Sequence, residues 1–177
     1  MSQKQEPMIF DNPIFGENRK SDNNKPQPNL LIVDDEWQTV DELSELLTEE
    51  GYLIETATDA RTALNVLAKN PNIDLIIVDI RMPGMDGLEM LRCARSIVPN
   101  GRSLSAIVLT GQVAVHQEEV SAINIGTLEF IAKPISAEIL LDTVRRVKNV
   151  LKEQREKYYF DKYLEKKELR NAHLGYK

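Results

Sequence analysis

The chain has 177 residues, of which 42% are apolar and 28% charged, with a formal net charge of −6. This composition is typical of one soluble globular domain with tails, and no segment approaches the ~20 consecutive apolar residues of a membrane span. A single cysteine, Cys93, excludes an internal disulfide and a multi-cysteine zinc site. The N-terminus lacks the apolar core of a signal peptide, so we expect a cytoplasmic protein without membrane attachment.

The charge is distributed unevenly along the chain. Residues 1–144 carry a net charge of −12, whereas residues 145–177 carry +6. An acidic body is a poor binder of a phosphate backbone. The basic residues of the tail alternate with glutamates, which favours a solvated helix face. We therefore expect no direct DNA binding.

Residues 1–29 are polar, contain four prolines and show no apolar period. This pattern predicts a disordered N-terminal arm. Two short apolar clusters, at 8–10 and 13–15, are either incidental or dock on a partner or on the protein's own surface.

The first predicted strand is the continuous apolar run 30–33, which ends in Asp34 and Asp35. A helix follows and stops at Gly51, a residue typical of helix ends. Its apolar face consists of Val40, Leu43, Leu46 and Leu47.

The next predicted strand, 52–57, mixes apolar and polar residues, as a less covered edge strand does. Thr58 or Asp59 is suited to cap a second helix, which closes at Pro71.

The apolar run 75–78 leads directly into Asp79, and the sequence Met-Pro-Gly at 82–84 prevents the strand from continuing. A continuous Val/Ile run suits a strand of a parallel sheet that is covered on both faces. Ligands of such sheets bind beyond the carboxyl ends of the strands, so Asp79 stands where chemistry is expected. On the other interpretation, Asp79 merely caps or turns the chain. A helix is predicted from about residue 86 to 98.

A further buried run, 106–109, ends in the hydroxyl of Thr110. The helix expected at 112–125 has only a weak apolar stripe, which indicates a loosely held element. A short strand, 128–132, then leads to Lys133 and Pro134.

Five strands that alternate with five helices predict parallel pairing and right-handed crossovers, and therefore a doubly wound α/β sheet. The strand ends of such a sheet share one edge. Carboxylates crowded there without His or Cys select a hard cation such as Mg²⁺, and a carboxylate beside that cation can act as a nucleophile toward phosphorus. A lysine and a hydroxyl would contact the phosphoryl oxygens. The residues expected at this edge are Asp34, Asp35, Asp79, Thr110 and Lys133.

Four motifs together resemble the receiver domain of bacterial two-component response regulators. They are Asp34-Asp35-Glu36, the stretch Val-Asp-Ile-Arg-Met-Pro-Gly-Met-Asp-Gly at 78–87, Thr110-Gly111, and Phe-Ile-Ala-Lys-Pro at 130–134. The resemblance covers residues 30–150 and implies a flavodoxin-like sheet with strand order 2-1-3-4-5. The remaining residues, 151–177, are expected to form a helical C-terminal extension.

The resemblance implies a role for each matching residue. Asp79 is the implied phospho-acceptor, and Lys133 the phosphate partner. The implied Mg²⁺ ligands are Asp34, Asp35, Asp79 and the main-chain carbonyl of Arg81. Thr110 and Phe130 are the implied switch pair, and the Lys133–Pro134 bond is expected to be cis. Ordinary structural roles stay open for three of them: Phe130 as core, Lys133 as an exposed strand end, and Thr110 as a cap.

The last helix is expected to start near Ser136 and to continue to about Arg170. Past Leu151 its apolar positions thin out, so a two-stranded coiled coil with Tyr158 at the seam and a solvent-exposed helix are both compatible with the sequence. The adjacent rings of residues 158–160 favour some partner.

The leading hypothesis is a phosphorylation-activated signalling switch, without enzymatic turnover beyond its own phosphorylation and dephosphorylation. Asp79 would accept the phosphoryl group from a sensor histidine kinase or a histidine phosphotransfer protein. The chain would signal to a downstream protein, with a homodimer through the last helix or through the face of the fourth helix, fifth strand and fifth helix as an option.

One alternative is the receiver-plus-linker part of a larger regulator. Another is an aspartyl-phosphate-forming phosphohydrolase, although Arg81 stands where those enzymes have a second aspartate. A nucleotide-binding Rossmann module is disfavoured, because acids and not glycines follow the first strand.

Overall fold

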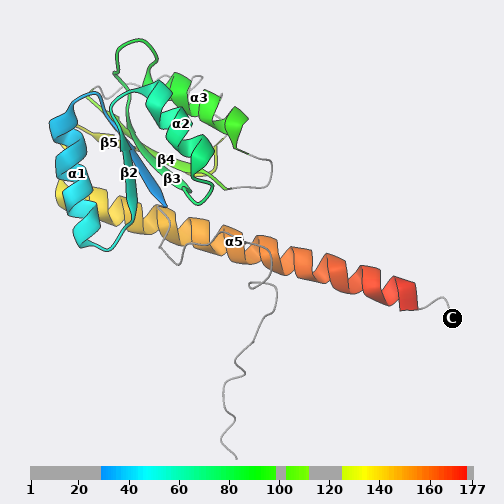
Figure 1. Ribbon diagram of the computed structural model, residues 1–177. Helices are drawn as coiled ribbons and strands as arrows, with labels where there is room; N and C mark the ends of the chain where they lie inside the picture. The colour runs from blue at the N-terminus through cyan, green and yellow to red at the C-terminus, as the bar shows by residue number, and fades with distance from the viewer. Residues whose placement is uncertain (1–28, 99–102, 112–124, 175–177) are drawn as a thin grey trace, which may run out of the picture.

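The computed structural model describes residues 29–98, 103–111 and 125–174, with side chains as far as Leu169 (Figure 1). Its five strands form one parallel sheet in the order β2-β1-β3-β4-β5, which confirms the predicted doubly wound topology. The strands are β1 (Leu30–Val33), β2 (Ile54–Ala57), β3 (Leu75–Asp79), β4 (Ser105–Thr110) and β5 (Leu128–Ala132). The mixed strand β2 lies at the edge, as its composition predicts.

Four helices are present in the described part of the chain: α1 (Trp37–Glu49), α2 (Ala60–Lys69), α3 (Gly87–Ile97) and α5 (Ala137–Leu174). Residues 112–124 of the predicted fourth helix, and residues 1–28 of the predicted arm, lie outside the described residues. Among the described helices, none combines the length and apolar content that crossing a membrane would require.

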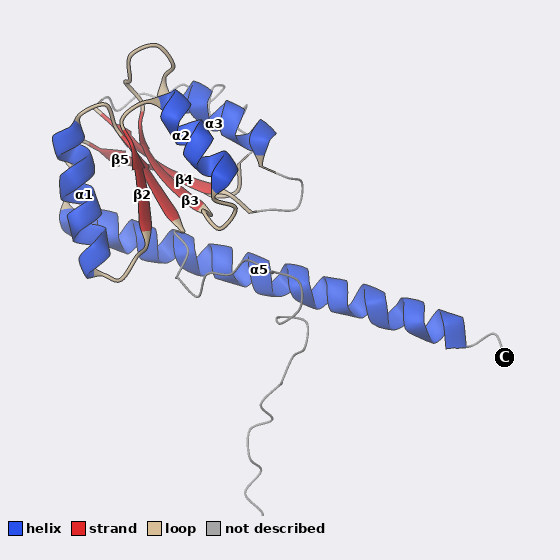
Figure 2. Ribbon diagram, viewed as in Figure 1, coloured by secondary structure: helices blue, strands red, loops and turns tan. Residues whose placement is uncertain are grey.

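The sheet is covered on both faces, as Figure 2 shows. Helices α2 and α3 pack on one face and α1 and α5 on the other, and each pair closes its own apolar core. The alternation of side chains along a strand explains the division. Leu31 and Val33 of β1 point into the core under α2 and α3, whereas Leu30 and Ile32 point into the core under α1 and α5. All four are fully buried, as are the central strands β3 and β4, so the continuous apolar runs are two-sided strands.

Local signals set the helix ends. Gly51 follows α1 with a φ of +85°, a conformation that favours glycine. The Asp59 side chain accepts a hydrogen bond of 2.8 Å from the Thr62 N–H and caps α2, and this side-chain and backbone bonding to Thr62 lowers the pKa of Asp59. Asp86 caps α3 in the same way, through the Glu89 N–H at 2.8 Å.

Helix α5 leaves the domain while still tied to it. Among its described side chains, Leu151 is the last buried one, and every side chain from Lys152 to Leu169 is exposed. The buried carboxylate of Asp74, at the start of β3, binds Lys148 at 2.5 Å and Arg155 at 2.5 Å. Burial lowers the pKa of Lys148, and the neighbouring Asp74 offsets part of that effect. This pairing holds the helix one turn past its last core contact, so the extension starts from a fixed direction (Figure 1).

Candidate functional site

The parallel register brings two acids together at the carboxyl edge of the sheet. Val33 of β1 pairs with Val78 of β3, so Asp34 and Asp79 both follow this pair on neighbouring strands. Both are buried, with Asp34 fully enclosed and Asp79 6% exposed. Two buried carboxylates on neighbouring strand ends repel each other and destabilise the fold unless a cation compensates their charge.

Lys133 supplies that cation from the end of β5. Its Nζ lies 2.8 Å from Oδ2 of Asp34 and 2.6 Å from Oδ1 of Asp79. Burial alone would lower the pKa of Lys133, but the hydrogen bonds and charges of the two aspartates outweigh that effect and raise it. The stabilisation from this raised pKa is therefore fully present at neutral pH and is lost only in alkali, as the pH rises through the pKa of the folded state.

Hydrogen bonds that involve the main chain position Asp34 and Lys133. Oδ1 of Asp34 accepts a hydrogen bond of 2.9 Å from the Glu36 N–H, which fixes the carboxylate at the start of α1. The Lys133 N–H donates to the Thr110 carbonyl at 2.8 Å, so the ends of β4 and β5 stay in contact. The Lys133–Pro134 peptide bond is cis, as expected from the resemblance.

The other candidates lie around this triad at different depths. The Thr110 side chain is buried at the end of β4, and Phe130 on β5 is 38% exposed. Asp35 and Arg81 are exposed. The structure therefore joins Asp34, Asp79 and Lys133 by direct contacts and leaves Asp35 outside them.

Gly87 is a positioning residue that the sequence does not reveal as such. Its N–H donates to the Ile80 carbonyl at 2.9 Å and closes the loop that follows β3. A Cβ at this residue would lie 2.1 Å from the Asp79 carbonyl oxygen. The start of α3 thus packs against the backbone of Asp79, at a distance that only glycine allows. In the sequence, Gly87 stands out only as the last residue of the motif at 78–87.

The donor chemistry of the site suits a hard divalent cation, because the available ligands are carboxylate and carbonyl oxygens. Within the described residues, no three acidic, histidine or cysteine side chains gather as a group able to hold a metal ion. Here Lys133 neutralises Asp34 and Asp79, and their remaining oxygens and Asp35 at the rim are the donors that fit such an ion.

Comparison with known proteins gives a consistent result. Residues 30–145 match the family model of the response regulator receiver domain. The two-component response regulator PprB of Pseudomonas aeruginosa is 33% identical over 125 residues, which cover 71% of this chain and 45% of that protein. The response regulator MprA of Mycolicibacterium vanbaalenii is 35% identical over 116 residues, covering 66% and 48%. The chain thus spans about half the length of these curated relatives.

Solved structures agree with the fold. The chemotaxis protein CheY4 of Vibrio cholerae superposes with a TM-score of 0.60 at 32% identity, over 69% of this chain and 99% of CheY4. A CheY-like receiver domain protein of Methanospirillum hungatei superposes with a TM-score of 0.61 at 30% identity, over 75% of this chain and 99% of that one.

Proposed function

This chain belongs to the response regulator receiver family, and we propose that it works by phosphorylation-dependent signalling in a two-component system, with Asp79 as the residue that accepts the phosphoryl group. The observation that supports this assignment is the pair of buried carboxylates, Asp34 and Asp79, bridged by Lys133 at 2.8 and 2.6 Å. Asp79 is the last residue of the central strand β3, and its side chain is the more exposed of the two, at 8% against 1% for Asp34.

A carboxylate oxygen of Asp79 attacks phosphorus in line with the leaving group. A phosphorus–oxygen bond to Asp79 forms, and the bond from phosphorus to the donor's histidine nitrogen breaks. The Lys133 ammonium already contacts Asp79, so it is placed to move onto a phosphoryl oxygen. The donor is a sensor histidine kinase or a histidine phosphotransfer protein, which agrees with a cytoplasmic location.

Mg²⁺ is the cofactor that we propose for this site. The residues that would hold it are Asp34, Asp35, Asp79 and the main-chain carbonyl of Arg81. When bound, the ion neutralises the carboxylates and the charge on the phosphoryl oxygens. Asp35 is exposed, so its carboxylate is accessible to an ion from solvent.

Thr110 and Phe130 are the proposed switch residues. Thr110 is buried and directly follows Leu109, the residue of β4 that pairs with Asp79, so it lies on the strand end next to the proposed phospho-acceptor. Phe130 lies on the neighbouring strand β5 and is 38% exposed, so its ring is not held within the apolar core. Phosphorylation would bias an equilibrium between the two arrangements and change the surface around β5 and α5.

Residues 30–150 form the proposed receiver domain, and residues 151–177 a helical extension that transmits or stabilises its state. The downstream target is a protein. Because the chain spans about half the length of its curated relatives, the receiver-plus-linker part of a larger regulator is the second arrangement that these facts favour.

The stoichiometry of phosphorylation tests the function. Incubation with acetyl phosphate and Mg²⁺ should add one phosphoryl group per chain, detected as a single mass increment by intact-protein mass spectrometry. Release of phosphate should then be limited to decay of that one group. Sustained multiple turnover of small phosphate esters would instead identify a phosphohydrolase.

Mg²⁺ is expected to change the fluorescence of Trp37, the only tryptophan in the sequence. Trp37 is the first residue of α1, and the residue before it donates its N–H to Asp34. Because Trp37 is 63% exposed, a small rotation of its side chain near the acids alters the contact of the indole with water. Titration with MgCl₂, with NaCl at matched ionic strength as the control, should give a saturable change. A signal equal to that of the NaCl control would count against the metal site.

Replacing Lys133 with glutamine is expected to destabilise the fold without Mg²⁺, because Asp34 and Asp79 would face each other without a cation. The expected loss in the free energy of unfolding is about 1–3 kcal/mol, less than for a fully buried pair, since the Lys133 side chain is 27% exposed. Urea unfolding at pH 7 measures this loss, and saturating Mg²⁺ should recover part of it. The exposed Lys152→Gln serves as the control. Equal stability of Lys133→Gln and wild type would refute the bridging role.

A further inference from the structure

The part of α5 beyond the domain carries an exposed apolar patch that the proposed function does not use. From Lys152 to Leu169 every side chain is exposed, including four large apolar ones close together. Most of the stability of helices in proteins comes from the packing of an apolar face, and the described part of the chain buries no such face in this segment. The patch consists of Tyr159 (41% exposed), Phe160 (61%), Tyr163 (48%) and Leu164 (40%).

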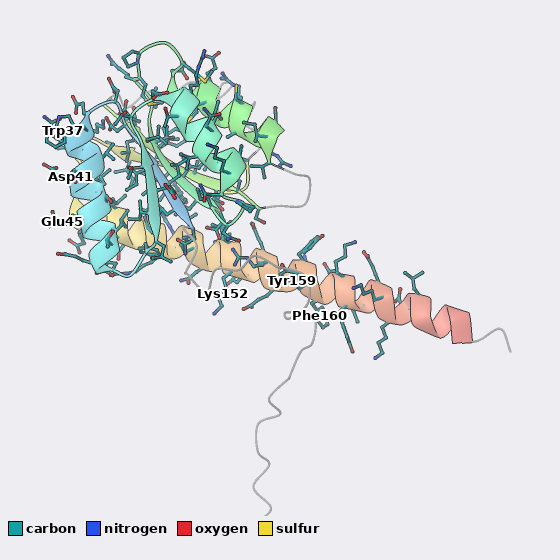
Figure 3. The ribbon with its side chains drawn as sticks, viewed as in Figure 1. Trp37, Asp41, Glu45, Lys152, Tyr159 and Phe160 are labelled. Carbon is teal, nitrogen blue, oxygen red and sulfur yellow. The ribbon has the colours of Figure 1, made fainter. Side chains whose placement is uncertain are left out.

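The four residues share one face of the helix. At about 100° per residue, positions i, i+1, i+4 and i+5 lie within an arc of about 140°, and Figure 3 shows Tyr159 and Phe160 on the segment beyond the domain. Tyr158 falls on nearly the opposite side from the centre of this arc. The tie from Arg155 to Asp74 at 2.5 Å lies one turn earlier and fixes the direction in which the patch projects.

The charges that flank the patch distinguish between two orientations of a second helix paired with it. Glu156 lies four residues before Phe160, and Lys167 four residues after Tyr163, so both continue the same face. Two parallel helices in register would place Glu156 against Glu156 and Lys167 against Lys167. Two antiparallel helices with the twofold axis between residues 161 and 162 place each Glu156 opposite Lys167 of the second copy, and Phe160 opposite Tyr163.

The length of the helix fits the same arrangement. With that axis, the helix end at Leu174 lies opposite Asn149 of the second copy, close to Leu151, where its helix leaves the domain. The two helices overlap over the whole extension, and the two domains lie at opposite ends. Tyr159 then faces Leu164 of the second copy on both sides of the axis.

We propose that the patch of Tyr159, Phe160, Tyr163 and Leu164 pairs with the same patch of a second copy of this chain, as an antiparallel two-helix dimer. Eight apolar side chains bury on the order of 1,000 Å² in total, which is at the lower limit for a specific interface. The dimer is therefore reversible, with a dissociation constant in the micromolar range. It does not require phosphorylation of Asp79.

Sedimentation velocity of the full chain, from low micromolar to several hundred micromolar, tests the patch. Wild type should shift from monomer to dimer with increasing concentration. Phe160→Ser with Tyr163→Ser should weaken the dimer by about tenfold or more. Tyr158→Ser is the matched control. The Tyr158 ring is 46% exposed and meets the Tyr159 ring edge-on, with 5.7 Å between centroids, but it starts from the other side of the helix. Its loss should therefore leave the dissociation constant within about twofold of wild type.

Charge exchange tests the orientation. Glu156→Lys alone places Lys opposite Lys, and Lys167→Glu alone places Glu opposite Glu, so each variant should associate more weakly than wild type. An equimolar mixture of the two should recover dimer, because every facing pair is then complementary. A mixture no better than either variant, or a Tyr158→Ser effect as large as that of the double variant, would overturn the antiparallel pairing. A monomer at all concentrations would overturn the dimer itself, and a change in tyrosine exposure on deletion of residues 1–28 would then assign the patch to the chain's own arm.

Discussion

Asp79→Asn is expected to abolish phosphorylation of the chain. The asparagine amide lacks the anionic oxygen that attacks phosphorus, and no second carboxylate occupies the end of β3. After incubation with acetyl phosphate and Mg²⁺, intact-protein mass spectrometry should show one added phosphoryl group on wild type. On the variant, labelling should fall by at least about a hundredfold.

Asp86→Asn is the matched control for this substitution. It removes the same charge from the loop that follows β3, while asparagine retains the capping bond that Asp86 makes to the Glu89 N–H. We expect Asp86→Asn to be labelled like wild type. Labelling of Asp79→Asn, or loss of labelling in Asp86→Asn, would contradict the assignment of Asp79 as the phospho-acceptor.

Gly87→Ala is expected to cause the largest loss of stability among single-methyl substitutions near the site. The new Cβ would lie 2.1 Å from the Asp79 carbonyl oxygen and 3.0 Å from its carbonyl carbon. Both are backbone atoms, so the end of β3 or the start of α3 must move. Overpacking of this kind costs about 1–3 kcal/mol in the free energy of unfolding, and it should slow phosphorylation because Asp79 shifts with its backbone.

Gly111→Ala provides the comparison for Gly87→Ala. Gly111 follows β4 at the same edge, and a Cβ there meets nothing within 4 Å. Its free energy of unfolding should stay within about 0.5 kcal/mol of wild type in a urea titration. Because alanine is intrinsically the better helix former by about 1 kcal/mol, a loss in Gly87→Ala measures the contact with Asp79. If both variants unfold at the same urea concentration, that contact does not constrain the site.

The strands could be predicted because their signals are local. A two-sided strand requires a continuous apolar run, and each of the runs 30–33, 75–78 and 106–109 lies within a fully buried strand. The site then follows from topology, since parallel strands gather their carboxyl ends at one edge. The fold was therefore accessible from the sequence, and Lys133 contacts Asp34 and Asp79 at the predicted edge of the sheet.

Two features were not accessible, for different reasons. Asp34 and Asp35 are adjacent in sequence, which predicts that they act as a pair. Successive side chains point in different directions, however, so Asp34 is buried and Asp35 is exposed. Asp74 forms salt bridges with Lys148 and Arg155 of helix α5, which are distant from it in the sequence. Such a network has no sequence period, because each charge looks like an ordinary solvated residue until the helix packs on the sheet.

The central claim is that Asp34, Asp79, Thr110 and Lys133 form one cation-dependent phosphoryl site. Amide chemical shifts of the full chain, recorded by NMR before and after addition of Mg²⁺ with beryllofluoride, a mimic of the phosphoryl group, test it directly. The largest changes should fall together on the residues that follow β1, β3, β4 and β5, and should disappear in Asp79→Asn. Changes confined to a single strand end, or unaltered in Asp79→Asn, would contradict the account.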